Sequence, residues 1–96
     1  MKALVDTGSQ VTLMSERVFR RHFKGPSVNV FRFKLTAANG NPIPTVGCFV
    51  TDIEYATNVI PDCVVVIGED GPGQPDLLLG MNVLSQLPNF SLTPTP

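Results

Sequence analysis

Short apolar runs, separated by glycine and proline, dominate the pattern along the chain. Alternating apolar and polar positions are typical of strands with one exposed face, and short continuous apolar runs are typical of buried strands. On this basis the sequence predicts β-strands at residues 3–5, 11–14, 28–35, 62–67 and 77–79. The chain is therefore expected to be mainly β.

Two segments instead carry apolar residues at helical spacing. Ser15 can cap the first helix, and Phe19 and Phe23 lie one turn apart on the same face of it. The Gly-Pro pair at residues 25–26 then ends this helix. Residues 83–87 predict a second, shorter helix, which the following proline ends.

The strongest turn signal in the chain is the pair Asn39-Gly40. It follows the predicted strand at residues 28–35 and precedes a return arm at residues 42–55. Two prolines exclude the first half of this arm from the centre of a sheet. We therefore expect an exposed hairpin that projects from the body, with Gly47 allowing a bend or a close contact at its base.

Composition limits the classes of protein to which the chain can belong. Its 96 residues allow one domain, and 43% of them are hydrophobic, which is enough for a modest core that a partner subunit would help to stabilise. The formal net charge of −1 argues against a nucleic-acid or anionic-membrane binder, which would usually be basic. The nine prolines and eight glycines agree with a turn-rich β chain.

The two cysteines, Cys48 and Cys63, form no C-x-x-C motif and have no metal-ligating neighbours. We expect reduced thiols, with a disulfide as the alternative, and neither a metal nor a cofactor. The apolar run at residues 63–67 is too short to cross a bilayer, and Asp6 interrupts the first apolar stretch too early for a signal peptide. An intracellular location is therefore expected.

Candidate chemistry is concentrated in Asp6-Thr7-Gly8-Ser9. Two carboxylates that lie close together share one proton, so that one activates water while the other polarises a carbonyl group. Gly8 would let the turn fold tightly and let a second chain approach. The Thr7 hydroxyl could bind a neighbouring main chain, and the Ser9 hydroxyl could donate to the Asp6 carboxylate.

A second suitable carboxylate is missing from the sequence. The other aspartates are not followed by Thr-Gly or Ser-Gly; they are Asp52, Asp62, Asp70 and Asp76. A two-fold homodimer would supply the second carboxylate, because the same turn then meets its own copy at the symmetry axis.

Three motifs in the same order resemble a known family. They are Ala-Leu-Val-Asp-Thr-Gly-Ser at residues 3–9, Ala-Ala-Asn-Gly at residues 37–40 with Gly47 following, and Leu-Leu-Leu-Gly-Met-Asn-Val-Leu at residues 77–84. Together they resemble the retropepsin-like aspartic proteases, and the chain is most similar to the protease region of gypsy-type LTR retrotransposon and retroviral Gag-Pol polyproteins.

This resemblance implies a closed acid-protease barrel with one or two short helices, which forms one half of an obligate homodimer. It also implies an aspartic endopeptidase that cleaves polyproteins. The catalytic turn would be Asp6, Thr7 and Gly8. Substrate contacts would come from Ser9 and from a flap at Ala38, Asn39, Gly40 and Asn41, and the dimer interface would contain Thr7, Asn82, Phe90 and Leu92.

Two departures from the family pattern stand out. Family members carry further strands before the catalytic turn, whereas five residues precede Asp6 here. We therefore expect residues 1–96 to form a single protease domain that lacks N-terminal strands. Met81 stands where retroviral members often have an arginine, so an intersubunit salt bridge at that position is not available.

Less specific interpretations remain for each feature. The Asp-Thr-Gly-Ser segment could be an ordinary turn, and the hairpin at Asn39-Gly40 could have no gating role. His22 has no catalytic neighbours, so Ser9 and Ser15 lack the base of a serine-hydrolase triad. The basic positions of the first helix are expected to form a solvated face. The alternative function is a catalytically inactive retropepsin-like module for dimerisation or peptide binding.

Overall fold

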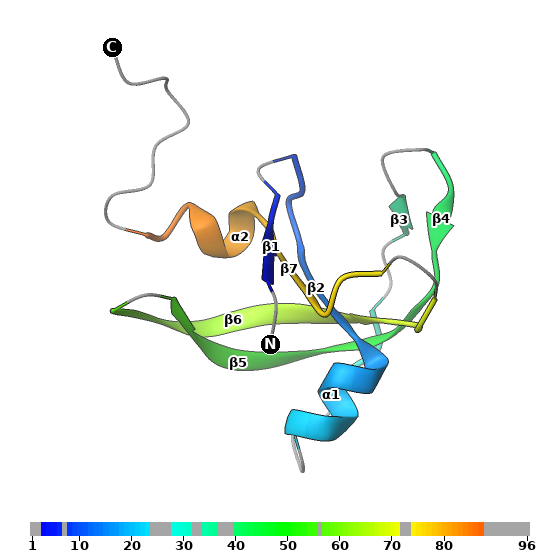
Figure 1. The fold of residues 1–96 in the computed structure, drawn as a ribbon, viewed down its shortest axis with the longest axis horizontal. Coiled ribbons are helices and arrows are strands. Elements are labelled where there is room, and N and C mark those ends of the chain that lie inside the picture. Colours follow the sequence, from blue (N-terminus) through cyan, green and yellow to red (C-terminus); the bar gives the residue numbers. More distant parts are fainter. Residues whose placement is uncertain are drawn as a thin grey trace.

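The structure is a computed structural model, and it describes residues 3–6, 8–23, 28–31, 34–36, 40–55, 57–71 and 74–87. It is mainly β with two short helices, as predicted (Figure 1). The elements in chain order are β1 (Ala3–Val5), β2 (Thr12–Ser15), α1 (Glu16–His22), β3 (Leu35–Thr36), β4 (Pro42–Ile43), β5 (Thr45–Tyr55), β6 (Asn58–Gly68), β7 (Leu77–Leu79) and α2 (Met81–Leu84).

The main sheet has five strands in the order β1-β7-β2-β6-β5. Strands β1 and β2 follow one another in the chain, but β7 lies between them. β7 runs parallel to β1, with Val5 opposite Leu79, and antiparallel to β2, with Leu78 opposite Leu13. Consecutive strands usually pair directly. Here β7, which comes late in the chain, instead lies between the two strands that flank the Asp6 turn.

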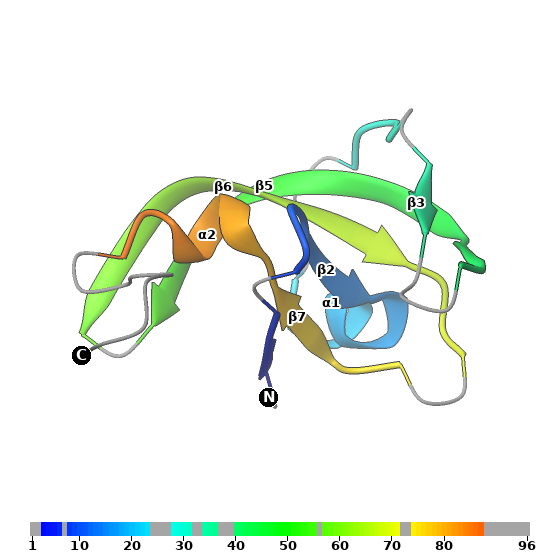
Figure 2. The same ribbon diagram turned by 90° about the horizontal axis from the view of Figure 1, so that it is seen from above.

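The expected closed barrel is wrong for the described part of the chain, where the sheet is open and has β1 and β5 at its edges. Closing a barrel requires enough tilted strands for its first and last members to pair. Here β1 is only three residues long, and all three are exposed. The long strands β5 and β6 instead bend into an arch, and α1 and α2 lie beneath it (Figure 2).

Two apolar clusters fill the space between the sheet and the helices. The first joins α1 to the sheet and contains Met14, Val18, Phe49, Val65 and Ile67. The second joins α2 to the sheet and contains Ile60, Cys63, Leu79, Val83 and Leu84. Because β2 and β7 are interior strands that contribute to these clusters, the turn that connects β1 to β2 is attached to the packed part of the sheet.

Helix α1 forms as the sequence predicts. The Ser15 hydroxyl accepts a hydrogen bond from the Val18 amide at 3.3 Å and thus caps the first turn. Phe19 and Phe23 pack against Phe49, with ring centroids 4.8 and 5.0 Å from it. The helix is therefore fixed at its start by a cap and along one face by aromatic packing.

The hairpin of β3 and β4 forms a separate two-stranded sheet that stands away from the main one (Figure 1). Gly40 has a φ of 86°, a left-handed conformation that favours glycine, in the loop between the two strands. Among the described strands, β4 pairs only with β3, which confirms that the proline-containing start of the return arm is not a central strand.

The sequence predicted a single strand at residues 28–35, and this prediction is wrong for the described residues of that range. Only Asn29 pairs with β5, through two hydrogen bonds with Cys48 of 2.7 and 2.9 Å, and regular pairing resumes at Leu35. At the crossing point, a Cβ on Gly47 would lie 2.6 Å from the Asn29 carbonyl oxygen. The predicted close contact at Gly47 is therefore confirmed.

Both cysteines are free thiols, as predicted. Across the described ranges, no helix is long and apolar enough to cross a membrane.

Candidate active site

Asp6 is the first residue after β1 and is half-buried. Its amide donates to the Leu79 carbonyl at 3.0 Å, which extends the pairing of β1 with β7 by one residue. The Gly8 amide donates to Asp6 Oδ1 at 2.9 Å, and the Ser9 amide donates to the Asp6 carbonyl at 3.2 Å. The turn thus fixes both the backbone and the carboxylate of Asp6.

Gly8 approaches the carboxylate closely, as expected for a tight turn. A Cβ built at Gly8 would lie 3.2 Å from Asp6 Oδ1, which is tighter than most real Cβ contacts. A side chain at this position would push against the same oxygen that the Gly8 amide binds. Gly8 is also exposed, so the turn is open to solvent on that side.

The Ser9 hydroxyl was expected to donate to the Asp6 carboxylate, and the structure places it elsewhere. It donates to the Val11 carbonyl at 2.8 Å and accepts from the Val11 amide at 3.3 Å. Both contacts are local, because a serine hydroxyl readily bonds main-chain groups two residues away. The Gly8 amide supplies the donor to Asp6 instead.

The segment that follows β7 packs against the turn that contains Asp6. A Cβ on Gly80 would lie 2.0 Å from the Val11 carbonyl oxygen, so only glycine fits there. The Met81 amide donates to the Ser9 carbonyl at 2.7 Å. The turn after β1 is therefore packed and hydrogen-bonded against the start of α2.

The structure describes only some of the other residues predicted for the site. Thr7, Ala38, Asn39, Phe90 and Leu92 lie outside the described residues. Gly40 and Asn41 are exposed in the β3–β4 hairpin. The Asn82 amide group is engaged within the chain: its oxygen accepts from the Thr12 hydroxyl at 2.8 Å, and its nitrogen donates to the Val64 carbonyl at 3.0 Å.

Thr12 was not identified from the sequence. It is fully buried at the end of the Asp6 turn, where its hydroxyl also accepts from the Gly80 amide at 3.1 Å. The signal was a polar residue in a run of apolar ones, Val-Thr-Leu-Met at residues 11–14. Such a residue needs hydrogen-bond partners when buried, but the sequence does not show that they lie on residues 80 and 82.

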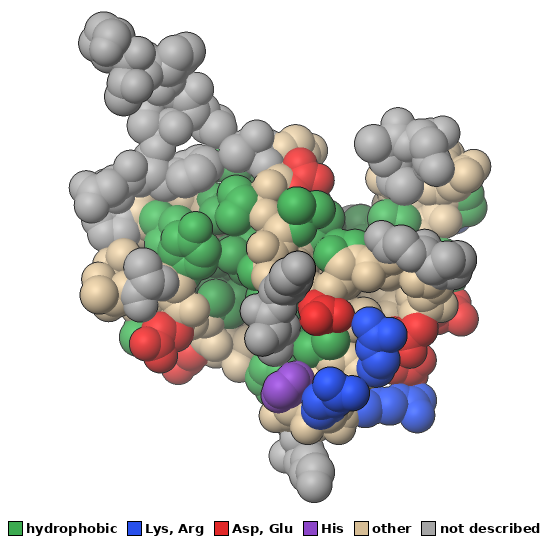
Figure 3. Space-filling view, in the orientation of Figure 1, with side chains coloured by type: hydrophobic (Ala, Val, Ile, Leu, Met, Phe, Trp, Pro, Cys, Tyr) green, Lys and Arg blue, Asp and Glu red, His purple; other side chains and the backbone are tan. Residues whose placement is uncertain are grey.

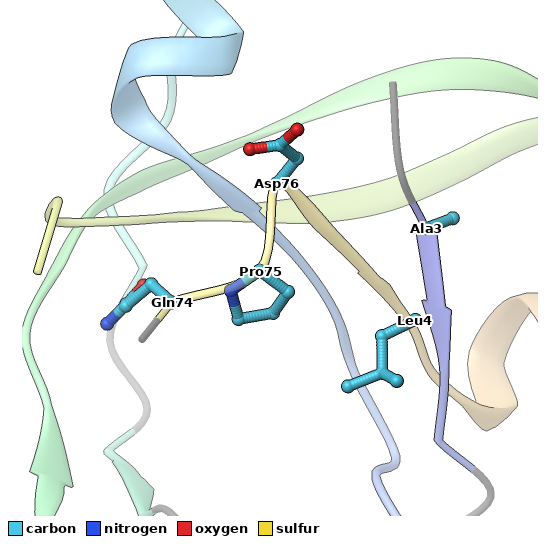
Figure 4. A pocket seen from close by; sticks show the side chains of 5 residues that line it. All are labelled: Ala3, Leu4, Gln74, Pro75 and Asp76. Atoms are coloured by element: carbon cyan, nitrogen blue, oxygen red, sulfur yellow. The ribbon is translucent and has the colours of Figure 1, made fainter. Parts of the chain in front are cut away.

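An open cavity of about 510 Å³ lies beside β1, two residues before Asp6. Its lining is mostly apolar and is formed by Ala3, Leu4, Gln74, Pro75 and Asp76. In Figure 4 the Leu4 side chain points toward the Pro75 ring, while the Asp76 carboxylate points to the opposite side. Asp76 forms an exposed ion pair of 3.2 Å with Arg17. Leu4 and Pro75 contribute an apolar shelf to the lining of the cavity.

The described basic residues of α1 lie away from the turn (Figure 1). Exposed arginines and His22 gather over α1 (Figure 3), and Arg20 pairs with Glu16 at 2.6 Å along the same helix. This arrangement agrees with the predicted solvated helix face. Within the part of the chain that the structure describes, no three histidine, cysteine or acidic residues are grouped as metal ligands would be.

A family model described as gag-polyprotein putative aspartyl protease matches residues 1–86. The chain belongs to this family. The match includes the Asp6 turn, the β3–β4 hairpin, β7 and α2. It confirms the resemblance to retropepsin-like aspartic proteases of Gag-Pol type that the three sequence motifs indicated. No curated protein matches the chain.

Proposed function

We propose that the protein is an aspartic endopeptidase, in which Asp6 of two copies forms one catalytic dyad. The observation that carries this proposal is the geometry of Asp6, a half-buried residue whose carboxylate accepts a hydrogen bond from the Gly8 amide at 2.9 Å. In a dyad, one carboxylate takes a proton from water and the other, protonated, donates to the substrate carbonyl. A rigid turn suits this task because the two carboxylates must keep a fixed separation.

The need for a second copy follows from where the other aspartates lie. Asp52 accepts a hydrogen bond from the Asp62 amide, far along the β5–β6 arch. Asp70 accepts from the Arg17 amide, and Asp76 precedes β7, at the opposite end of that strand from Asp6. Each of these carboxylates has its own structural surroundings away from the turn, so a second chain is the simplest source of the partner for Asp6.

The surroundings of Asp6 support a peptide substrate with apolar side chains. The shelf formed by Leu4 and Pro75, which begins two residues before Asp6, would receive such a side chain. The β3–β4 hairpin, with Gly40 and Asn41 in its exposed loop, would close over the peptide and exclude water. We extend the same proposal to Thr7 and to the tail at Phe90 and Leu92 as parts of the dimer interface, and to polyproteins as the natural substrates.

The test is the isosteric change Asp6→Asn, which removes the carboxylate and keeps the shape of the side chain. We expect peptide cleavage at mildly acid pH to fall by roughly a thousandfold or more, with folding retained by circular dichroism. Asp62→Asn is the matched control, because Asp62 is exposed with a φ of 54°, a conformation that asparagine also tolerates. Equal cleavage by Asp6→Asn and the parent would refute the assignment.

A mixing experiment tests the shared dyad. Adding excess Asp6→Asn chain to the parent would draw parent chains into mixed dimers with one carboxylate, so the activity should fall, while excess Asp62→Asn should not lower it. Sedimentation measures the dimer in the same samples. An active monomer, or activity that is insensitive to the mixed chain, would contradict the dimeric site. The non-catalytic alternative would be established if the folded parent bound peptides but did not cleave them. A statine-type inhibitor serves as the control for cleavage.

A further inference from the structure

A buried polar network lies directly behind the Asp6 turn. The Thr12 hydroxyl accepts from the Gly80 amide at 3.1 Å and donates to Asn82 Oδ1 at 2.8 Å. The Asn82 side-chain nitrogen donates in turn to the Val64 carbonyl at 3.0 Å. Thr12 is fully buried, so these two contacts replace the water that its hydroxyl loses on folding. The network ties β2, β6 and the start of α2 to one another.

The position of this network along the turn gives it a role. The segment from Leu79 to Asn82 holds the Asp6 turn at its beginning through the Asp6 amide, and in its middle through the Ser9 carbonyl. The Thr12 hydroxyl provides the third attachment, at the end of the turn. Two of the attachments use main-chain groups alone. Thr12 is therefore where a side chain determines how the turn sits against α2.

We propose that Thr12 and Asn82 are positioning residues that hold the Asp6 turn in its catalytic geometry. This inference rests on the proposed function, and it gives Asn82 a role inside the subunit rather than the predicted one at the dimer interface. Loss of the Thr12 hydroxyl would leave the Gly80 amide and Asn82 Oδ1 without their partner. The segment around Gly80 would move to recover hydrogen bonds, and the turn packed against it would shift.

Catalysis is more sensitive to such a shift than folding is, because a misplacement of about 1 Å can lower a rate by about a hundredfold. Thr12→Val keeps the shape of the side chain and removes the hydroxyl, whereas Thr12→Ser keeps the hydroxyl. We expect Thr12→Val to lower kcat roughly tenfold while KM stays within about twofold. Thr12→Ser should retain most of the parent kcat. Because serine lacks the threonine methyl group but keeps the hydroxyl, this result would show that the hydroxyl matters and not packing alone.

Control variants separate an effect on catalysis from effects on stability and dimerisation. Val18→Ala weakens the core cluster beneath α1, away from the turn, and should leave kcat per folded dimer unchanged. Each variant is assayed at a protein concentration at which sedimentation shows the dimer. Asn82→Ala should lower kcat with an unchanged dissociation constant of the dimer. If it weakens the dimer and leaves kcat at saturating protein unchanged, Asn82 acts at the interface and the proposal fails for it.

An NMR measurement separates this proposal from the proposed function. In Thr12→Val, the amide signals of Gly8 and Ser9 should shift and their hydrogen exchange should accelerate, while Thr12→Ser should resemble the parent. These signals report the geometry of the turn even if the parent proves to have no protease activity, in which case only the proposed function fails. Unchanged Gly8 and Ser9 signals in Thr12→Val, or an equal loss of kcat in Thr12→Ser, would overturn the positioning role.

Discussion

Replacing Gly80 by alanine tests the close packing that holds the Asp6 turn. The backbone of Gly80 is extended, with φ −98° and ψ −178°, so any residue could adopt it and only space is limiting. A Cβ would lie 2.0 Å from the carbonyl oxygen, 2.5 Å from the carbonyl carbon and 2.9 Å from the nitrogen of Val11. Real Cβ atoms essentially never show contacts under 3.0 Å, and all three of these are with main-chain atoms.

The cost of Gly80→Ala follows from this geometry. The Val11 main chain must retreat, and its carbonyl is the group that accepts from the Ser9 hydroxyl. Overpacking of a well-filled site typically costs 1–3 kcal/mol, and contacts with main chain leave little room for relief, so we expect a loss of about 3 kcal/mol. Because small domains are stable by about 5–15 kcal/mol, most molecules should remain folded while the turn is displaced.

Urea unfolding at one fixed protein concentration measures this loss, because the stability of the proposed dimer would depend on concentration. Gly71→Ala is the matched control: its Cβ would lie 3.8 Å from the nearest atom, an ordinary contact. This control should change the free energy of unfolding by less than about 0.5 kcal/mol. The reasoning would be refuted if Gly80→Ala unfolded at the same urea concentration as the parent, or if both alanine variants lost the same stability.

Two further predictions concern the helix cap and the buried thiol. Ser15→Ala removes the acceptor of the Val18 amide and should cost about 1 kcal/mol, seen as a melting temperature lower by roughly 4–8 °C; an unchanged melting temperature would contradict the cap. Burial raises the pKa of the Cys63 thiol, and the carboxylates of Asp52 and Asp62 act in the same direction. The unfolded chain then releases this proton first, so the free energy of unfolding should fall as the pH rises above about 8.5. Urea unfolding between neutral and alkaline pH should show a smaller fall in Cys63→Ala, and identical slopes would disprove this contribution.

The sequence by itself determined the local features of the chain. Ser15 begins a helix because its hydroxyl can cap the following turn, and Phe19 and Phe23 face the core because they lie one helical turn apart. Gly40 adopts a left-handed conformation within the connection of a hairpin, as the Asn-Gly pair indicated. Asp6 follows a short strand in a tight turn, which local turn chemistry predicts. In each case the physical cause lies within a few residues.

Only the tertiary structure decided how these pieces form a site. No local pattern states that β7 inserts between β1 and β2, or that the sheet stays open, because both depend on which distant strands find a partner. The Ser9 hydroxyl had several possible acceptors, and the folded turn selected the Val11 carbonyl. Thr12 is joined to Gly80 and Asn82 across about 70 residues of chain. Such contacts form only after segments far apart in the sequence meet. The sequence therefore identified Asp6 as the candidate carboxylate, and the packing around it revealed what holds that carboxylate in place.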